Sequence, residues 1–165
     1  METKIRPATP QDLNGILEIV NHNILHSTAV YDYDPKDQEF LQQWFDDKLS
    51  GNWPVVVADD NGIVVGYGSY GPFRFKQGYR FTIEHSVYAA PGHTGKGIGK
   101  LLLTELIRLA KESGYHCMIG GIDANNADSI AFHKKFGFVE TGIIRESGYK
   151  FGKWLDLLFM QLLLE

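Results

Sequence analysis

The chain has 165 residues, of which 44% are hydrophobic and 22% charged, and its formal net charge is -4. This length is below the roughly 250 residues at which chains usually divide, so we expect one domain over residues 1–165. The acidic balance provides no basic field for phosphate backbones, which excludes nucleic acid as an expected partner.

Neither the N-terminus nor any other stretch suggests contact with a membrane. The first residues contain no apolar run of the signal-peptide type, and no stretch reaches the roughly 20 apolar residues of a membrane span. We therefore expect a cytoplasmic protein with no membrane partner. The single cysteine, Cys117, lies in an apolar stretch and is interpreted as a small core residue. His22 and His26 are spaced for one helical face, but no third ligand follows at a diagnostic spacing, so no metal site is expected.

The first elements are a strand and two helices. Residues 4–8 read as a short strand, after which Thr9 and Pro10 supply the N-cap and the first position of a helix. The end of this helix, within residues 21–33, is left open. The Asp-Pro pair at residues 34 and 35 is typical of a second helix start. Five side chains of that helix are expected to face inward: Phe40, Leu41, Trp44, Phe45 and Leu49.

A hairpin and a third strand form the middle of the chain. Residues 54–59 and 63–70 are apolar, β-branched runs, and the Asp-Asn-Gly sequence between them has turn chemistry. Residues 79–88 read as a long strand, on which the even positions from 82 to 88 should face the side opposite to Phe81, Ile83 and Val87. A glycine-rich loop follows this strand.

The C-terminal part alternates helices and strands. Leu101, Leu102, Leu106, Leu109 and Ala110 form an apolar stripe on a helix that begins at Ile98 and stops at Gly114. Further elements are expected at 116–123, 126–136, 138–145 and 153–164. The order predicts an α/β fold with a mixed, mostly antiparallel central sheet flanked by helices on both faces. The last strand is too apolar for an exposed edge, so we expect it inside the sheet or in a dimer interface.

The glycine-rich loop has the features of a phosphate site. It joins a strand to a long helix, so backbone N–H groups and the helix dipole converge there. Glycines at 95, 97 and 99 allow close approach of an anion, and Lys96 and Lys100 add positive charge. A simple turn with incidental glycines is the alternative.

Two familiar phosphate motifs do not match this loop. A Walker A loop needs glycine where Thr94 stands and Ser or Thr where Leu101 stands. The dinucleotide pattern fails as well, because Lys100 occupies its third glycine position.

Two motifs resemble those of the GNAT superfamily of N-acetyltransferases. The Thr-Gly-Lys-Gly-Ile-Gly sequence at 94–99 is similar to the superfamily's pyrophosphate loop, and residues 125–138 are similar to its second coenzyme A motif. More narrowly, residues 21–28, 79–88 and 148–156 resemble phosphinothricin and methionine sulfone or sulfoximine acetyltransferases. The resemblance implies acetyl-CoA as co-substrate, a homodimer, and a small-molecule amine as acceptor, namely the α-amine of a small amino acid.

The resemblance also implies the residues that hold acetyl-CoA. The pantetheine arm would lie along the end of the third strand, where the Val87 N–H would polarise the thioester carbonyl as an oxyanion donor. Thr94 departs from the usual Gln or Arg, although the backbone donors do not depend on it. The full expected set is Ser86, Val87, Tyr88, Thr94, Gly95, Lys96, Gly97, Ile98, Gly99, Asn125 and Lys134.

Acetyl transfer to an α-ammonium group requires a base. Glu84 is the candidate, because it falls on the polar side of the strand and matches the family's glutamate; a solvent-facing or salt-bridged glutamate is the alternative. His133 is a candidate proton donor to the departing thiolate, equally interpreted as a histidine packed beside the cofactor, and Tyr88 is the fallback acid.

Arginines near Glu84 suggest an acceptor that carries an anion. Arg74 and Arg80 suit a carboxylate or phosphinate, with solvated surface charge as the alternative. The expected substrate site comprises Phe73, Arg74, Phe75, Arg80, Ile83, Glu84 and His85. An acetyltransferase for a peptide N-terminus or polyamine is the alternative within this class, and a non-catalytic acyl-CoA-binding module is the alternative outside it.

Overall fold

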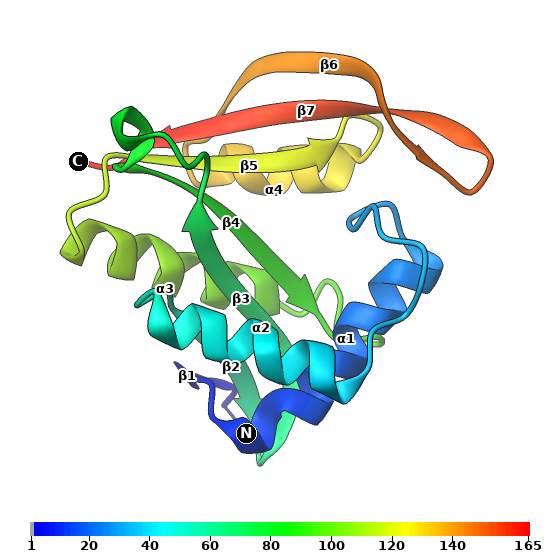
Figure 1. Cartoon of the computed structure of the whole chain (residues 1–165), viewed down its shortest axis with the longest axis vertical. Coiled ribbons are helices and arrows are strands. Elements are labelled where there is room, and N and C mark those ends of the chain that lie inside the picture. The colour runs from blue at the N-terminus through cyan, green and yellow to red at the C-terminus, as the bar shows by residue number, and fades with distance from the viewer. Residues whose placement is uncertain (1) are drawn as a thin grey trace.

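The computed structural model describes residues 2–165, which form one seven-stranded sheet with helices on both faces (Figure 1). The strand order is β1-β2-β3-β4-β5-β7-β6, and among these pairs only β4 and β5 run parallel. The expected mixed, mostly antiparallel α/β fold is confirmed. The strands are β1 Lys4–Pro7, β2 Val55–Asp60, β3 Ile63–Pro72, β4 Thr82–Ala89, β5 Cys117–Asp123, β6 Val139–Lys150 and β7 Lys153–Leu163.

The helices divide between the two faces of the sheet. Helices α1 (Leu13–His26) and α2 (Gln38–Ser50) pack against one face, and α3 (Ile98–Glu112) and α4 (Ala127–Lys135) cover the other. Alternation along β2 explains both contacts, because Val57 faces the α1–α2 cluster while Val56 faces the α3 cluster. The two helical layers thus share one sheet.

The N-terminal elements differ from the prediction at their ends. A single 3-10 turn, Pro10–Asp12, precedes α1, and α1 runs on to His26. The predicted start of α2 at residues 34 and 35 is wrong by three residues, because Asp37 is the N-cap and its carboxylate accepts a hydrogen bond from the Phe40 N–H at 2.8 Å.

Several predicted inward positions lie at the surface instead. Phe40 and Leu49 are 48% and 57% exposed, so α2 buries a narrower stripe centred on Leu41 and Phe45. The predicted start of the third strand at residue 79 is wrong by three residues, because Gln77–Tyr79 is a 3-10 turn and β4 begins at Thr82. On α3, Leu101 is exposed beside a fully buried Leu102.

Two other expectations are confirmed. The β2–β3 hairpin turns at Asn61 and Gly62, both with positive φ, as the Asp-Asn-Gly sequence indicates. The apolar β7 lies between β5 and β6 in the sheet, and Cys117 is buried.

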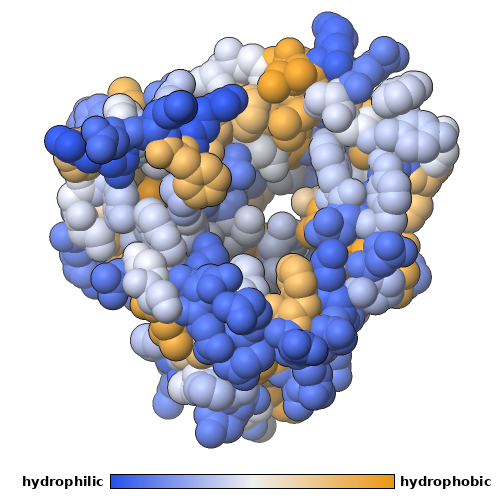
Figure 2. Space-filling view, in the orientation of Figure 1, coloured by the Kyte–Doolittle hydropathy of each residue, from blue (hydrophilic) through white to orange (hydrophobic). Residues whose placement is uncertain are grey.

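The sheet opens in its middle. Pairing between β4 and β5 spans Thr82–Glu84 and Cys117–Ile119, after which the two strands diverge (Figure 1). A space-filling view in the same orientation shows the surface hollowed near its centre (Figure 2). Within residues 2–165, no helix combines the length and apolar character needed to cross a membrane.

Candidate active site

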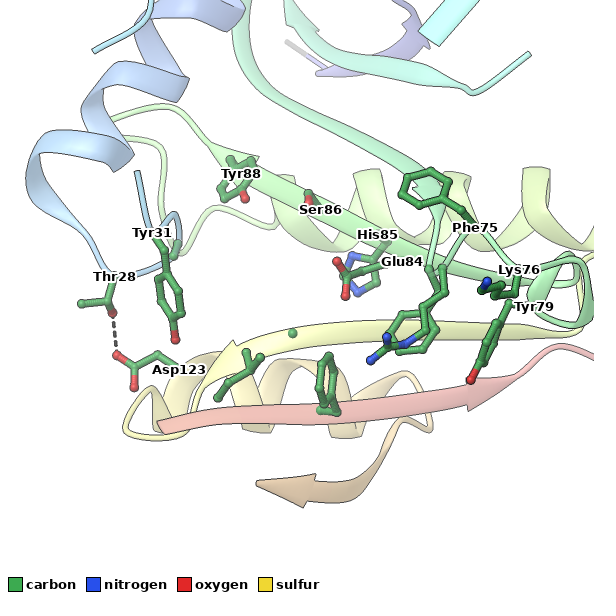
Figure 3. Close-up of a pocket in the computed structure, with 16 residues that line it drawn as sticks. Thr28, Tyr31, Phe75, Lys76, Tyr79, Glu84, His85, Ser86, Tyr88 and Asp123 are labelled. Atoms are coloured by element: carbon green, nitrogen blue, oxygen red, sulfur yellow. Dashed lines mark hydrogen bonds between the residues drawn. The ribbon is translucent and has the colours of Figure 1, made fainter. Parts of the chain in front are cut away.

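A cavity of about 940 Å³ occupies the opening in the sheet. Its walls come from β4, β5, β7, the loop after α1 and the loop between β3 and β4 (Figure 3). Glu84, Ser86 and Tyr88 contribute to it from alternate positions of β4, as expected for one face of a strand. The polar face predicted for this strand therefore lines this cavity.

Glu84 lies near the middle of this cavity (Figure 3). Burial raises the pKa of its carboxyl above the ordinary value of 4.5. No ion pair involving Glu84 occurs within residues 2–165, and its Oε2 would lie 3.8 Å from a Cβ added at Gly121. An unpaired carboxylate with a raised pKa is a stronger base than an ordinary glutamate, which suits it to accept a proton.

The backbone of β4 offers an unpaired donor at Val87. The Thr82 carbonyl accepts the Phe73 N–H on the β3 side, whereas the Phe81 carbonyl accepts the His116 N–H at 2.9 Å on the β5 side. Because these directions alternate along a strand, the Val87 N–H points toward β5. Pairing with β5 has ended by this point, so the N–H points into the opening of the sheet.

The loop before α3 presents free backbone donors. At the start of the loop the His93 N–H donates to the Ala90 carbonyl, and at its end the Leu101 N–H donates to the Gly97 carbonyl. Between them, the N–H groups of residues 94–100 have no partner within the described part of the chain. Gly95 and Gly97 have φ of 79° and 81°, and no atom lies within 4 Å of a Cβ built at either position. The loop thus keeps both the donors and the open space that an anion requires.

His133 and His85 form a buried pair behind β4. Their Nε2 atoms are 3.1 Å apart, and Nδ1 of His133 is 2.7 Å from the Ser129 carbonyl oxygen. Burial lowers the pKa of both imidazoles, that of His85 to about 3, so both are neutral at pH 7. A carbonyl only accepts, so the ring proton of His133 is on Nδ1, and its Nε2 accepts from His85.

This tautomer leaves His133 without a proton to donate into the cavity.

Gly120 makes room for the pair of imidazoles, since a Cβ there would lie 3.2 Å from Nε2 of His85. Both imidazoles line a smaller cavity of about 80 Å³ that also contacts Ser86 and Val87.

In the second coenzyme A motif, residues 125–138, the asparagine that lines a cavity is not the one that was predicted. Asn125 is not among the residues that line either cavity, and its N–H donates to Asp123 at 3.0 Å. Asn126, which was missed, caps α4 through its Oδ1 and lines the smaller cavity. Its position as the N-cap before a helix was the available signal. Lys134 forms an ion pair with Glu140 at 2.9 Å.

The expected substrate residues only partly come together. Phe73, Arg74 and Phe75 line the cavity, whereas Arg80 lies outside it with its guanidinium over the Phe81 ring. The assignment of Ile83 is wrong for its side chain, which is fully buried in the core on the opposite side of β4.

Several residues that line the cavity were not predicted from the sequence, among them Lys76, Thr28 and Tyr31. Lys76 supplies a second cation next to Arg74, and Thr28 and Tyr31 enter from the loop after α1. Thr28 donates a hydrogen bond of 2.5 Å to Asp123 across the opening. Only the fold brings these segments, which are 95 positions apart, into contact.

No metal centre is evident in the described part of the chain. No group of three or more His, Cys, Asp or Glu side chains within residues 2–165 is arranged to hold a metal ion. His22 and His26 are neighbours, with ring centroids 4.9 Å apart.

Comparison with known proteins identifies the class of this site. Residues 20–138 match the model of the acetyltransferase (GNAT) family. The L-methionine sulfoximine/L-methionine sulfone acetyltransferase of Salmonella typhimurium is 44% identical over 161 residues, which cover 98% of this chain and 94% of the relative.

Solved structures agree with this result. The structure of an N-acetyltransferase from Staphylococcus aureus Mu50 has a TM-score of 0.98 at 43% identity and covers both chains fully. A GNAT superfamily phosphinothricin acetyltransferase from Sinorhizobium meliloti, in complex with AcCoA, has a TM-score of 0.95 at 38% identity and covers 99% of this chain and 89% of its own. The chain belongs to the GNAT family and is an N-acetyltransferase that uses acetyl-CoA.

Proposed function

We propose that this enzyme transfers the acetyl group of acetyl-CoA to the α-amine of a small L-amino acid. Methionine sulfone, methionine sulfoximine and phosphinothricin are the acceptors named for its relatives. The observation that carries the proposal is the arrangement of the large cavity, where Glu84 faces the same space as Arg74 and Lys76. One zwitterion satisfies both ends, since its amine suits the carboxylate and its carboxylate suits the cations.

Acetyl-CoA, when bound, supplies an activated acetyl thioester. The free N–H groups of residues 94–100 and the N-terminus of α3 would hold its pyrophosphate. The Val87 N–H would donate a hydrogen bond to the carbonyl oxygen of the thioester and would stabilise negative charge on that oxygen. Glu84 takes the proton from the ammonium group of the acceptor, directly or through water, which frees the nitrogen for attack.

We assign stabilisation of the departing thiolate to Tyr88. Burial raises the pKa of its phenol, and a hydrogen bond with Ser86 only partly opposes that rise, so Tyr88 stays protonated and remains a donor. It lines both cavities at the end of β4. His133 instead acts as a positioning residue, because its ring proton is held by the Ser129 carbonyl.

An acceptor screen tests the proposal. The purified enzyme is given acetyl-CoA and a panel of acceptors, and thiol release is followed at steady state. The panel contains methionine sulfone, methionine sulfoximine, phosphinothricin, spermidine and a short peptide. We expect the highest kcat/KM for the small α-amino acids. A preference for spermidine or the peptide contradicts the substrate class, and acetyl-CoA binding with no turnover favours the non-catalytic module.

We also propose that the enzyme works as a cytoplasmic homodimer. Support for the dimer comes from an apolar surface that joins the end of α1 to the tip of the β6–β7 hairpin. Its side chains are between 46% and 64% exposed: Leu25, Tyr33, Tyr149, Phe151 and Trp154. Analytical ultracentrifugation of the wild type and of Trp154→Lys tests this, with a dimer in the first and a monomer in the second expected. Cell fractionation tests the location.

A further inference from the structure

The Tyr31 hydroxyl is buried at the wall of the large cavity and has no hydrogen-bond partner. Tyr31 comes from the loop after α1, and Figure 3 shows it beside Thr28 and Asp123 at one end of the cavity. Lys76 lies toward the other end, and Glu84 lies between the two. A buried donor without a partner is costly, so its presence in a cavity indicates a ligand that completes the bond.

The Asp123 carboxylate at this end of the cavity accepts hydrogen bonds from donors other than Tyr31. One carboxylate oxygen of Asp123 accepts from the Thr28 hydroxyl at 2.5 Å, and the other accepts from the Asn125 N–H at 3.0 Å. Burial, followed by the charges of Asp123 and Asp156, raises the pKa of Tyr31. The phenol therefore keeps its proton and is a free donor.

The loop that carries Tyr31 is held in place. Lys150, which is buried, donates to the carbonyls of Ser27 at 2.7 Å and Val30 at 2.5 Å. The Tyr31 ring packs on the backbone of Gly148, where an added Cβ would lie 2.5 Å from the ring. Both contacts come from β6, so the hydroxyl is positioned before any ligand arrives.

We propose that the Tyr31 hydroxyl donates a hydrogen bond to an oxygen on the acceptor's side chain and so selects oxidised side chains over apolar ones. The inference rests on the proposed function, in which the cations bind the carboxylate of an amino acid and Glu84 binds its amine. Tyr31, at the other end of the cavity, is then left to contact the side chain. Asp123 has no ion pair within residues 2–165, whereas Asp156 is paired with Arg145 at 3.7 Å; the charge of Asp123 favours a neutral sulfone or sulfoximine over an anionic phosphinate at this end.

The test compares methionine sulfone with methionine, which lacks both oxygens but has the same carbon skeleton. In wild type, kcat/KM for the sulfone should exceed that for methionine, and Tyr31→Phe should lower this ratio about tenfold, chiefly through KM for the sulfone. Tyr33→Phe is the matched control, since its hydroxyl bonds to the Tyr149 carbonyl at the surface of the same loop. The control should leave the ratio unchanged.

Two outcomes overturn the inference. One is an unchanged ratio in a Tyr31→Phe variant whose thermal unfolding matches that of the wild type. The other is calorimetric binding of methionine sulfone that is equally tight in both proteins. If the wild type acetylates neither amino acid, the proposed function fails separately, and the calorimetry still measures the contact with Tyr31.

Discussion

Replacing Glu84 by Gln removes the base while keeping the size and polarity of the side chain. The α-ammonium group of a free amino acid has a higher pKa than a chain N-terminus, because the neighbouring carboxylate stabilises its charge, so only a small fraction is neutral at pH 7 and that fraction rises steeply towards pH 9. Loss of a positioned base costs about 10²-fold to 10⁴-fold in turnover. We therefore expect a deficit of about 10²-fold or more in kcat/KM at pH 7, which shrinks about tenfold or more by pH 9.

The wild-type profile should also reflect the carboxyl itself. Burial raises the pKa of Glu84, and only the carboxylate accepts a proton, so activity should fall as the pH drops through this raised value. The assay is steady-state thiol release from pH 5 to 9, with acetyl-CoA affinity measured by calorimetry as the control. Parallel profiles for wild type and Glu84→Gln would refute the assignment, as would a loss of acetyl-CoA affinity that accounts for the whole effect.

Three further predictions concern the loop and the residues near β4. Gly97→Val should weaken acetyl-CoA binding at least about tenfold in calorimetry, because Gly97 has φ of 81° and a side chain would enter the open loop; wild-type affinity would contradict the loop assignment. Tyr88→Phe should lower kcat about tenfold in the thiol-release assay, and His133→Gln should lower it less; the reverse order would show that His133 donates the proton. Burial lowers the pKa of His85 from 6.5 to about 3, so below pH 6.5 the unfolded chain binds a proton that the folded protein does not. The contribution of neutral His85 to the stability of the fold is therefore fully present above pH 6.5 and is lost as the pH falls below it. In urea unfolding, the free energy of unfolding of the wild type should thus fall by about 1.4 kcal/mol per pH unit below pH 6.5, and this fall should be absent in His85→Asn. Equal slopes of unfolding free energy against pH in the two proteins would contradict this.

The sequence predicted those parts of the molecule that depend on local patterns. Strand alternation placed Glu84 on the polar face of β4, and the glycines before α3 indicated an anion site. The family match confirms the acetyltransferase class that these motifs implied. Local signals failed at α2, where an Asp-Pro pair and Asp37 both resemble a helix start and only the hydrogen bond to Phe40 distinguishes them.

Contacts between distant segments were not predictable from one sequence. Thr28 meets Asp123 across 95 positions, and His85 meets His133 across 48, so neither pair leaves a local pattern. The tautomer of His133 follows from its bond to the Ser129 carbonyl, which requires coordinates. Lys76 was not predicted as a substrate residue, because only the coordinates show that it lines the cavity and that Arg80 does not.

The central claim is that the amine of an amino acid meets the acetyl thioester beside Glu84. Incubation of the enzyme with isotopically labelled acetyl-CoA and methionine sulfone, followed by NMR of the product, tests this most directly. We predict that the wild type transfers the labelled acetyl group to the α-nitrogen of methionine sulfone. Glu84→Gln should form this labelled product far more slowly at pH 7. Tight binding of acetyl-CoA with no transfer of label to this or any other α-amino acid would contradict the claim.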